Sequence, residues 1–232
     1  MQREMSDIAV IIGSGGGIGS SLKNELSKSA DFKQVVSYSK NHDIKLDITD
    51  EDQIYNKAKE LRERNVRIKL LINAFGYLHD SNYLPEKQIS DLKSTYLLKS
   101  FKINSIGNAL VIKYFGPLMD HANKSTIVCL SARIGSINDN YLGGWFGYRA
   151  SKAALNQIIK TASIEYSRKK SKLILVSMHP GTVITKLSKP FINKANYFTP
   201  SQAANNILRV NSRLKDIDTG TFIDYEGKKI SY

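Results

Sequence analysis

Cysteine is nearly absent from this chain, with Cys129 as the one example in 232 residues. One thiol cannot form an internal disulfide, so the composition favours a reducing compartment and we expect a cytoplasmic protein. Long apolar runs are missing as well, since stretches such as Ile8 to Ile12 and Ile127 to Leu130 are too short to span a bilayer. The first residues also lack the apolar stretch of a secretory signal. We therefore expect no association with a membrane.

Repeats, low-complexity tracts and linkers rich in proline, glycine or serine are absent too, which favours one domain over residues 1–232. The net charge of +13 is large, but the 34 basic residues are dispersed along the chain. This dispersal predicts a solvated, lysine-rich surface and no nucleic-acid partner. The histidines have no metal-ligand spacing, so we expect no metal site; they are His42, His79, His121 and His179.

Apolar runs that are typical of strands alternate with longer segments of helical periodicity. Strands are predicted at residues 8–12, 34–38, 44–46, 69–73, 126–130, 173–178 and 221–224. Helices are predicted at 17–29, from about 49 onward, over 89–120 with a break near Ser94, at 148–169 and at 201–210. Because the strands are continuous apolar runs, both faces of the sheet should be buried. The pattern predicts an α/β fold, a single-domain Rossmann-type doubly wound parallel sheet.

A cluster of glycines follows the first predicted strand and leads into the first predicted helix. Glycines at these positions allow a tight turn and a close approach of the backbone to a pyrophosphate. The free N–H groups and partial positive charge of the helix N-terminus then favour the phosphates. The turn therefore predicts a dinucleotide site, with contacts from Gly13, Ser14, Gly17, Ile18 and Gly19.

Further motifs follow in a fixed order, and together with the glycine spacing they resemble the short-chain dehydrogenase/reductase family. They are Asp47-Ile48, Asn73-Ala74-Phe75-Gly76, Asn104, Tyr148-x-x-x-Lys152 and Pro180-Gly181-Thr182-Val183-Ile184-Thr185. The resemblance implies that the first pair contacts the adenine and that the second motif ends the fourth strand beside the cofactor. It also implies closure over the nicotinamide by Pro180, Gly181, Val183 and Thr185. Residues 131–145 and 220–228 are similar to the C-factor and sniffer branch of carbonyl reductases.

Tyr148 and Lys152 are four residues apart on a predicted helix, so their side chains share a face one turn apart. Reduction of a carbonyl needs a proton at oxygen, and tyrosine is a weak acid with an ordinary pKa of roughly 10. A nearby ammonium stabilises the phenolate and lowers that pKa. Tyr148 is therefore the predicted general acid/base. By resemblance, Lys152 also holds the nicotinamide ribose, and Asn104 anchors a water that continues the proton relay.

The catalytic serine is the point where the chain departs from the family. The family's serine lies three residues before a glycine at the end of the fifth strand, and this position holds Ala132 when counted back from Gly135. Three alternatives are open. A bend at the strand end brings Ser131 to the substrate oxygen, Ser136 reaches back to it, or no serine acts. Ser131 is the first candidate.

The end of the second predicted strand bears on the choice of cofactor. Sites that prefer NAD place an acidic residue there to bind the ribose 2′-hydroxyl. This chain has Ser39 and Lys40 and no carboxylate in that stretch. Ser39 can hydrogen-bond a 2′-phosphate and Lys40 can neutralise it. We therefore predict NADP(H) in preference to NAD(H), although Gly16 occupies a loop position where many NADP-binding members carry arginine or lysine.

The segment 186–198 is expected to form a lid over the substrate, because it follows the motif that closes over the nicotinamide. Trp145, Phe146 and Tyr141 are candidate pocket residues. Arg133 and Arg149 flank the motifs, and each binds either an anionic substrate or a structural carboxylate. The predicted substrate is a small, partly apolar carbonyl compound or secondary alcohol.

Assembly and function follow by the same resemblance. The family pairs through its long helices, here near 95–120 and 148–168, so we expect a homodimer or homotetramer. The leading hypothesis is an NADP(H)-dependent oxidoreductase. The alternative is a catalytically weak NADP(H)-binding sensor or signalling protein, which the displaced serine favours.

Overall fold

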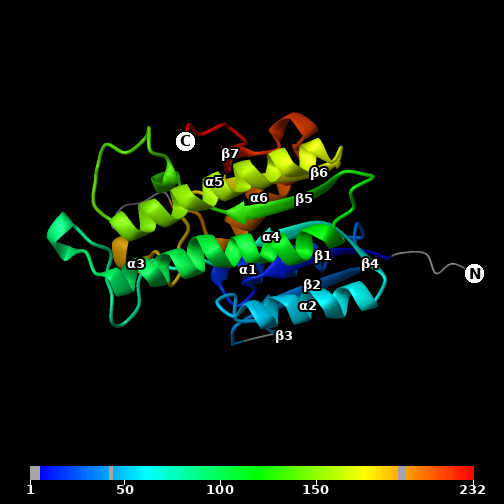
Figure 1. Ribbon diagram of the computed structural model, residues 1–232, viewed down its shortest axis with the longest axis horizontal. Helices are drawn as coiled ribbons and strands as arrows, with labels where there is room; N and C mark the ends of the chain where they lie inside the picture. The colour runs from blue at the N-terminus through cyan, green and yellow to red at the C-terminus, as the bar shows by residue number, and fades with distance from the viewer. Residues whose placement is uncertain (1–5, 42–43, 193–196) are drawn as a thin grey trace, which may run out of the picture.

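The computed structural model describes residues 6–41, 44–192 and 197–232. Within these residues, seven parallel strands form one sheet in the order β3-β2-β1-β4-β5-β6-β7 (Figure 1). The strands are β1 (Ser6–Ile12), β2 (Gln34–Ser39), β3 (Ile44–Lys45), β4 (Val66–Asn73), β5 (Ser125–Leu130), β6 (Leu173–His179) and β7 (Thr221–Asp224). The chain moves outward from β1 to β3 and then returns to β4, so the direction of winding reverses beside β1. The predicted doubly wound parallel sheet is confirmed, and ligands of such sheets bind at this reversal.

Six α-helices are found in the described part of the chain. They are α1 (Gly17–Leu26), α2 (Glu51–Glu63), α3 (Ser94–Phe101), α4 (Gly107–Phe115), α5 (Phe146–Arg168) and α6 (Pro200–Arg213). Local sequence explains two of the starts. The Asp50 side chain accepts the N–H of Gln53 at the start of α2, and the Thr199 side chain accepts that of Gln202 at the start of α6.

The helices cover the sheet on both faces. Helices α2, α4 and α5 bury one cluster of apolar side chains, which includes Ile54, Phe115 and Leu155. Helices α1 and α6 bury the other, which includes Leu22 and Ile207. Helices α4 and α5 run side by side across the first face (Figure 1). Burial on both faces explains why the strands are continuous apolar runs.

Element boundaries differ from the sequence expectation by a few residues. Helix α1 ends at Leu26, and α5 begins at Phe146, before the predicted start. The predicted break near Ser94 is confirmed, since the turn Ile89–Asp91 precedes α3. A π-helical turn, Lys102–Ile106, joins α3 to α4, and the periodicity did not predict it. No helix in the ranges described above is both long and apolar enough to cross a membrane.

Candidate active site

The turn after β1 depends on close backbone contacts that glycine permits. Gly13 has a φ of +97°, a left-handed conformation that favours glycine. A Cβ on Gly13 would lie 2.7 Å from the backbone nitrogen of Phe75, and a Cβ on Gly19 would lie 2.2 Å from the carbonyl oxygen of Gly13. The N–H groups of Gly13 and Ser14 donate to the carbonyl of Tyr38 at 2.8 and 3.1 Å. The turn is thereby fixed to the ends of β2 and β4.

Helix α1 begins beside this turn without a side-chain cap. Gly16 is the N-cap residue and makes no side-chain hydrogen bond to the first turn. A Cβ on Gly17 would lie 3.2 Å from side-chain atoms of both Thr185 and Pro200, so the loop after β6 reaches the same place. Ile18 packs partly against the core between α1 and the sheet. An uncapped helix N-terminus next to a glycine turn suits a phosphate group.

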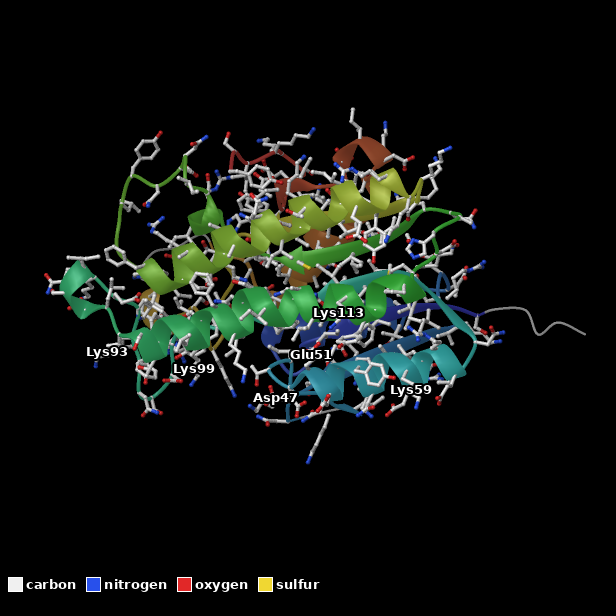
Figure 2. The ribbon with its side chains drawn as sticks, viewed as in Figure 1. Asp47, Glu51, Lys59, Lys93, Lys99 and Lys113 are labelled. Carbon is white, nitrogen blue, oxygen red and sulfur yellow. The ribbon has the colours of Figure 1, made fainter. Side chains whose placement is uncertain are left out.

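The end of β2 carries Ser39 and Lys40, which differ in exposure. Ser39 is buried, whereas the side chain of Lys40 is 70% exposed. Nζ of Lys40 lies 2.7 Å from a carboxylate oxygen of Asp47, at the edge of the molecule where α2 begins (Figure 2). Burial alone would raise the pKa of Asp47, but hydrogen bonds from Lys40 and Thr49 outweigh it and lower the pKa to about 2. Lys40 therefore has an ionised partner that the sequence argument for a 2′-phosphate did not include.

Ile48, the second residue of the predicted adenine pair, packs against the start of α4. A Cβ on Gly107 would lie 2.8 Å from Cδ1 of Ile48 and 3.0 Å from its carbonyl oxygen. Glycine at position 107 thus lets the loop that carries Ile48 approach the helix. This contact places the predicted adenine side of the site next to the segment that carries Asn104.

The end of β4 places Asn73 in the core and Gly76 at the site. Asn73 is 1% exposed, and its amide donates to Oδ1 of Asn108 at 3.0 Å and to Sγ of Cys129 at 3.4 Å. Asn73 therefore links β4 to α4 and β5. A Cβ on Gly76 would lie 3.7 Å from Nζ of Lys152, so the loop after β4 closely approaches this ammonium.

Asn104 lies in the π turn and is fully buried. Its Oδ1 accepts the N–H of Tyr77 at 2.8 Å, and its Nδ2 donates to the carbonyl of Tyr77 at 2.8 Å. Nδ2 also donates to Oγ of Ser151 on α5 at 3.0 Å. The backbone carbonyl of Asn104 accepts the amide of Asn108 at 2.9 Å. Asn104 thus joins the loop after β4 to α4 and α5.

Tyr148 and Lys152 lie in the first two turns of α5 and share its buried face. Nζ of Lys152 lies 5.9 Å from the centroid of the Tyr148 ring and donates to the carbonyl of Leu130 at 2.7 Å. The exposed fractions of Tyr148 and Lys152 are 8% and 3%. Lys152 therefore connects α5 to the end of β5, with the Tyr148 ring and Gly76 as neighbours.

Burial controls the proton affinity of both groups. It raises the pKa of Tyr148 above its ordinary value, and the neighbouring Tyr96 adds to the rise. It lowers the pKa of Lys152 to about 8, against a smaller opposing effect of Cys129. The expectation that the pKa of Tyr148 is lowered is therefore wrong for the net shift, because burial of the ring penalises the charged phenolate. Tyr148 is therefore a protonated phenol at neutral pH, the form that can donate to a carbonyl oxygen.

The serines beside β5 both have partners within the protein. Oγ of Ser131 donates to Oδ1 of Asn156 on α5 at 2.8 Å. Oγ of Ser136 donates to the carbonyl of Ser231 at 2.5 Å. Ala132 has extended backbone angles, φ −149° and ψ 146°, so its side chain lies on the opposite face from that of Ser131. Neither hydroxyl is therefore free to donate to a substrate in this arrangement.

The two arginines beside the site bind internal acceptors. The Arg133 guanidinium lies 3.2 Å from Asp139 and 3.4 Å from Asp224. Nε of Arg149 donates to the carbonyl of Gly144 at 3.0 Å, and NH2 donates to that of Gly143 at 3.1 Å. Arg133 thus binds structural carboxylates, one of the two roles that the sequence left open, whereas Arg149 binds backbone carbonyls, which is neither of them.

The loop after β6 leads into the expected lid. Gly181 has a φ of +83°, and a Cβ there would lie 2.6 Å from ring atoms of Phe198. Pro180 and Val183 are buried, and Thr185 donates its N–H to Oγ of Ser188 at 3.0 Å. Within the lid segment 186–198, residues 193–196 lie outside the described residues.

An aromatic wall, made by His79, Phe191 and Trp145, connects the expected lid to Tyr148. The Phe191 ring stands edge-on to His79 at 5.2 Å and to Trp145 at 5.0 Å, and Trp145 lies 6.3 Å from the Tyr148 ring. His79 also binds the lid backbone, with Nε2 at 3.1 Å from a carbonyl oxygen. Tyr141 is 87% exposed, so the expectation that it lines the pocket is wrong.

Several buried polar residues were missed by sequence reasoning. Glu86, Asn108 and Asn156 bind partners that are 61, 35 and 25 residues away in the chain, so no local motif reveals them. No group of three or more histidines, cysteines or acidic residues that could hold a metal occurs in the described ranges.

The sequence matches a known family profile over most of its length. The profile is described as enoyl-(acyl carrier protein) reductase, and it matches residues 19–221. A curated relative, 1-hydroxy-2-glutathionyl-2-methyl-3-butene dehydrogenase of Rhodococcus sp. strain AD45, is 29% identical, with 78% of this chain and 76% of the relative covered. C-signal of Myxococcus xanthus is 28% identical, with 62% of this chain and 83% of the relative covered.

A solved structure with a similar fold is the NADPH-bound carbonyl reductase from chicken fatty liver. It superposes with a TM-score of 0.86 at 24% identity and covers 99% of this chain and 100% of its own. At this identity the likeness concerns the fold, which extends over the full length of both chains. The sequence similarity to C-signal agrees with the resemblance to the C-factor branch.

Proposed function

Because the chain belongs to the short-chain dehydrogenase/reductase family and is an oxidoreductase of that type, we propose that it transfers hydride between NADP(H) and a small, partly apolar carbonyl compound or secondary alcohol. The observation that carries the proposal is the position of the Lys152 ammonium. It lies between the Tyr148 ring and the Leu130 carbonyl, and close to Gly76. These groups meet at the carboxyl edge of the sheet, beside the glycine turn.

The residues of the turn fit a dinucleotide. Positions 13 and 19 leave no room for a Cβ, and α1 starts beside them without a side-chain cap. We assign the diphosphate to Gly13, Ser14, Gly17, Ile18 and Gly19, following the general behaviour of such turns. The adenine would face Asp47 and Ile48, and the ribose would bind Tyr148 and Lys152. The cofactor would pass the end of β4 at Ala74 to Gly76, with Asn73 supporting this segment from the core, and the nicotinamide would face the loop of Pro180, Gly181, Val183 and Thr185.

The bound dinucleotide supplies the hydride, and the protein supplies the proton and its orientation. Tyr148 holds a proton on its phenol oxygen and donates it to the substrate oxygen. The phenolate that remains is stabilised by the Lys152 ammonium, which the Leu130 carbonyl holds in place. Asn104 fixes the loop of Tyr77 against α5, and we assign to it a water that supplies a proton to Lys152 as Lys152 passes its own proton to the Tyr148 phenolate.

Unlike Tyr148, the two candidate serines have no assigned role in proton transfer. Ser131 donates to Asn156 and Ser136 donates to the Ser231 carbonyl, so both contacts favour the alternative in which no serine acts. We propose that Tyr148 carries the proton alone. A loss of about tenfold or more in kcat, roughly 1.4 kcal/mol of barrier, in Ser131→Ala or Ser136→Ala would return the role to that serine.

Absorbance of NADPH against a panel of aldehydes, ketones and quinones tests the function. The panel includes a glutathione-conjugated alcohol run in the oxidative direction, because the name of the Rhodococcus relative contains one. We expect turnover that Tyr148→Phe lowers by about a hundredfold or more, in a variant that still binds NADPH. Equal turnover in Tyr148→Phe would refute the assignment of the acid.

A second candidate function is a cofactor-binding sensor or signalling protein. Ala132 in the serine position and the similarity to C-signal favour it. The buried pair of Tyr148 and Lys152 opposes it, since a sensor has little need of a proton donor at the cofactor. Tight NADPH binding without turnover on any compound of the panel would favour the sensor.

We also propose that the protein works as a homodimer or homotetramer in the cytoplasm. A groove of about 630 Å³ lies between α4 and α5 and is lined by Ile112, Ile158 and Tyr166 among others. These are the helices through which the resemblance predicts pairing. Light scattering that gives the mass of one chain would refute the assembly.

A further inference from the structure

Glu86 is a buried acidic residue that the proposed chemistry does not use. It lies in the loop between β4 and α3 and is 4% exposed. Both of its carboxylate oxygens accept the N–H of Gly147 on α5, each at 3.2 Å. Its backbone carbonyl accepts the N–H of Trp145 at 2.5 Å. We propose that Glu86 is the N-terminal cap of α5 and positions Tyr148, an inference that rests on the proposed role of Tyr148 as the acid.

Helix α5 needs a cap from outside its own sequence. Its N-cap residue, Trp145, has a left-handed φ of 53° and makes no side-chain hydrogen bond to the first turn. The first turn of α5 also contains no acidic residue. A helix start leaves backbone N–H groups without partners and carries partial positive charge, which an acceptor anion stabilises. Glu86 provides both the acceptor and the charge from a distant part of the chain.

The start of α5 in turn supplies the hydrogen-bond donor of the buried Glu86 carboxylate. No lysine or arginine forms an ion pair with Glu86 in the ranges that the structure describes, although such pairs are common for buried acids. A buried carboxylate is costly unless it is hydrogen-bonded. The hydrogen bonds from Gly147 therefore hold the Glu86 side chain in place as well as the start of the helix.

The space around Gly147 leaves little freedom for the first turn. A Cβ on Gly147 would lie 2.7 Å from Cε1 of Tyr96 and 3.1 Å from Oε1 of Glu86. Tyr96 is itself held by a hydrogen bond from its hydroxyl to the carbonyl of Leu78 at 2.7 Å. The peptide that immediately precedes Tyr148 is thus enclosed between two fixed side chains.

Arg149 also holds the turn at residues 143–147, which we call the corner before Tyr148. Its guanidinium donates to the carbonyls of Gly143 and Gly144, which form the approach to Trp145. Glu86 thus binds the N–H groups of the corner and Arg149 binds its carbonyls. Tyr148 directly follows the residues that they hold, so its position depends on both.

The test compares three substitutions of Glu86 in the full-length protein. Glu86→Gln keeps an oxygen that can accept the Gly147 N–H, Glu86→Asp withdraws the acceptor by one methylene, and Glu86→Ala removes it. The matched control is Glu63→Gln, which removes the charge of an exposed residue on α2. Steady-state kinetics with NADPH, cofactor binding by fluorescence and hydrogen exchange of the start of α5 are measured for each.

We expect Glu86→Ala and Glu86→Asp to lower kcat at least tenfold while the Kd of NADPH changes less than twofold. Glu86→Gln should recover kcat to within about threefold of the parent. Exchange at the start of α5 should increase in the order Gln, Asp, Ala. If Glu86→Ala does not fold, the comparison of Glu86→Asp with Glu86→Gln decides the question in the same way.

Two results would overturn the inference. One is a folded Glu86→Ala or Glu86→Asp with the parent kcat, and the other is a parallel loss of kcat and NADPH affinity that Glu86→Gln does not correct. If the parent protein turns over no compound of the panel, the proposed function fails instead. Hydrogen exchange then decides the cap by itself, since unchanged protection in Glu86→Ala would show that Glu86 does not hold α5.

Discussion

Replacement of Lys40 by alanine should weaken NADPH binding and leave NADH binding nearly unchanged. The Lys40 side chain is 70% exposed, so its attraction for a phosphate is close to the value for water. Two unit charges about 4 Å apart interact by about 1 kcal/mol in water, and a 2′-phosphate carries up to about two charges. The expected cost is about 1 to 2 kcal/mol, which corresponds to a rise of about five- to thirtyfold in the Kd of NADPH.

Asp47 weakens the attraction of Lys40 for a phosphate in the parent protein. Its carboxylate lies 2.7 Å from Nζ of Lys40 and is ionised at neutral pH, because its pKa is about 2. A 2′-phosphate must therefore share Lys40 with Asp47. In Lys40→Ala the Asp47 charge stays and repels the phosphate, which places the result toward the upper end of the range.

Calorimetric titration of both cofactors at constant ionic strength measures the effect. Lys45→Ala is the matched control, because Lys45 lies in the neighbouring strand β3 and is also exposed. We expect less than about a twofold change for it, as for an exposed charge without a direct contact. Equal weakening of NADPH and NADH in Lys40→Ala, or NADH binding as tight as NADPH in the parent, would refute the reasoning.

Three further outcomes follow from named contacts. Gly19→Ala should lower the free energy of unfolding in urea by about 2 kcal/mol or more, because the added Cβ would lie 2.2 Å from a backbone oxygen. Gly16→Ala is the control: its closest contact would be 3.4 Å, so it should cost less than half as much. The free energy of unfolding of the parent protein, minus that of Lys152→Met, should rise between about pH 8 and 10.5 by on the order of 3 kcal/mol. In that window the unfolded chain carries the ammonium and the folded chain does not, and a flat difference would contradict the low pKa of Lys152. Asn104→Ala should lower both kcat and thermal stability, since it leaves buried groups of Tyr77 without partners, and an unchanged melting temperature would oppose this account.

Local spacing in the sequence was sufficient for the fold and for part of the site. Continuous apolar runs predicted strands that are buried on both faces, and the parallel sheet confirms this. The glycines after β1 predicted a tight turn, which the left-handed Gly13 and the close contact of Gly19 explain. The interval between Tyr148 and Lys152 predicted one helix face, and both side chains lie on it. Each of these inferences depends on the period of a single element.

Only the tertiary structure decided how these side chains are used. The burial of Tyr148 reversed the expected direction of its pKa shift, because solvation depends on every element packed around the ring. The partners of Ser131, Lys40 and Glu86 lie on other elements of the fold. Sequence periodicity fixes which face of an element is apolar, whereas the partner of a buried polar group is set by which elements meet, and packing over long chain separations determines that.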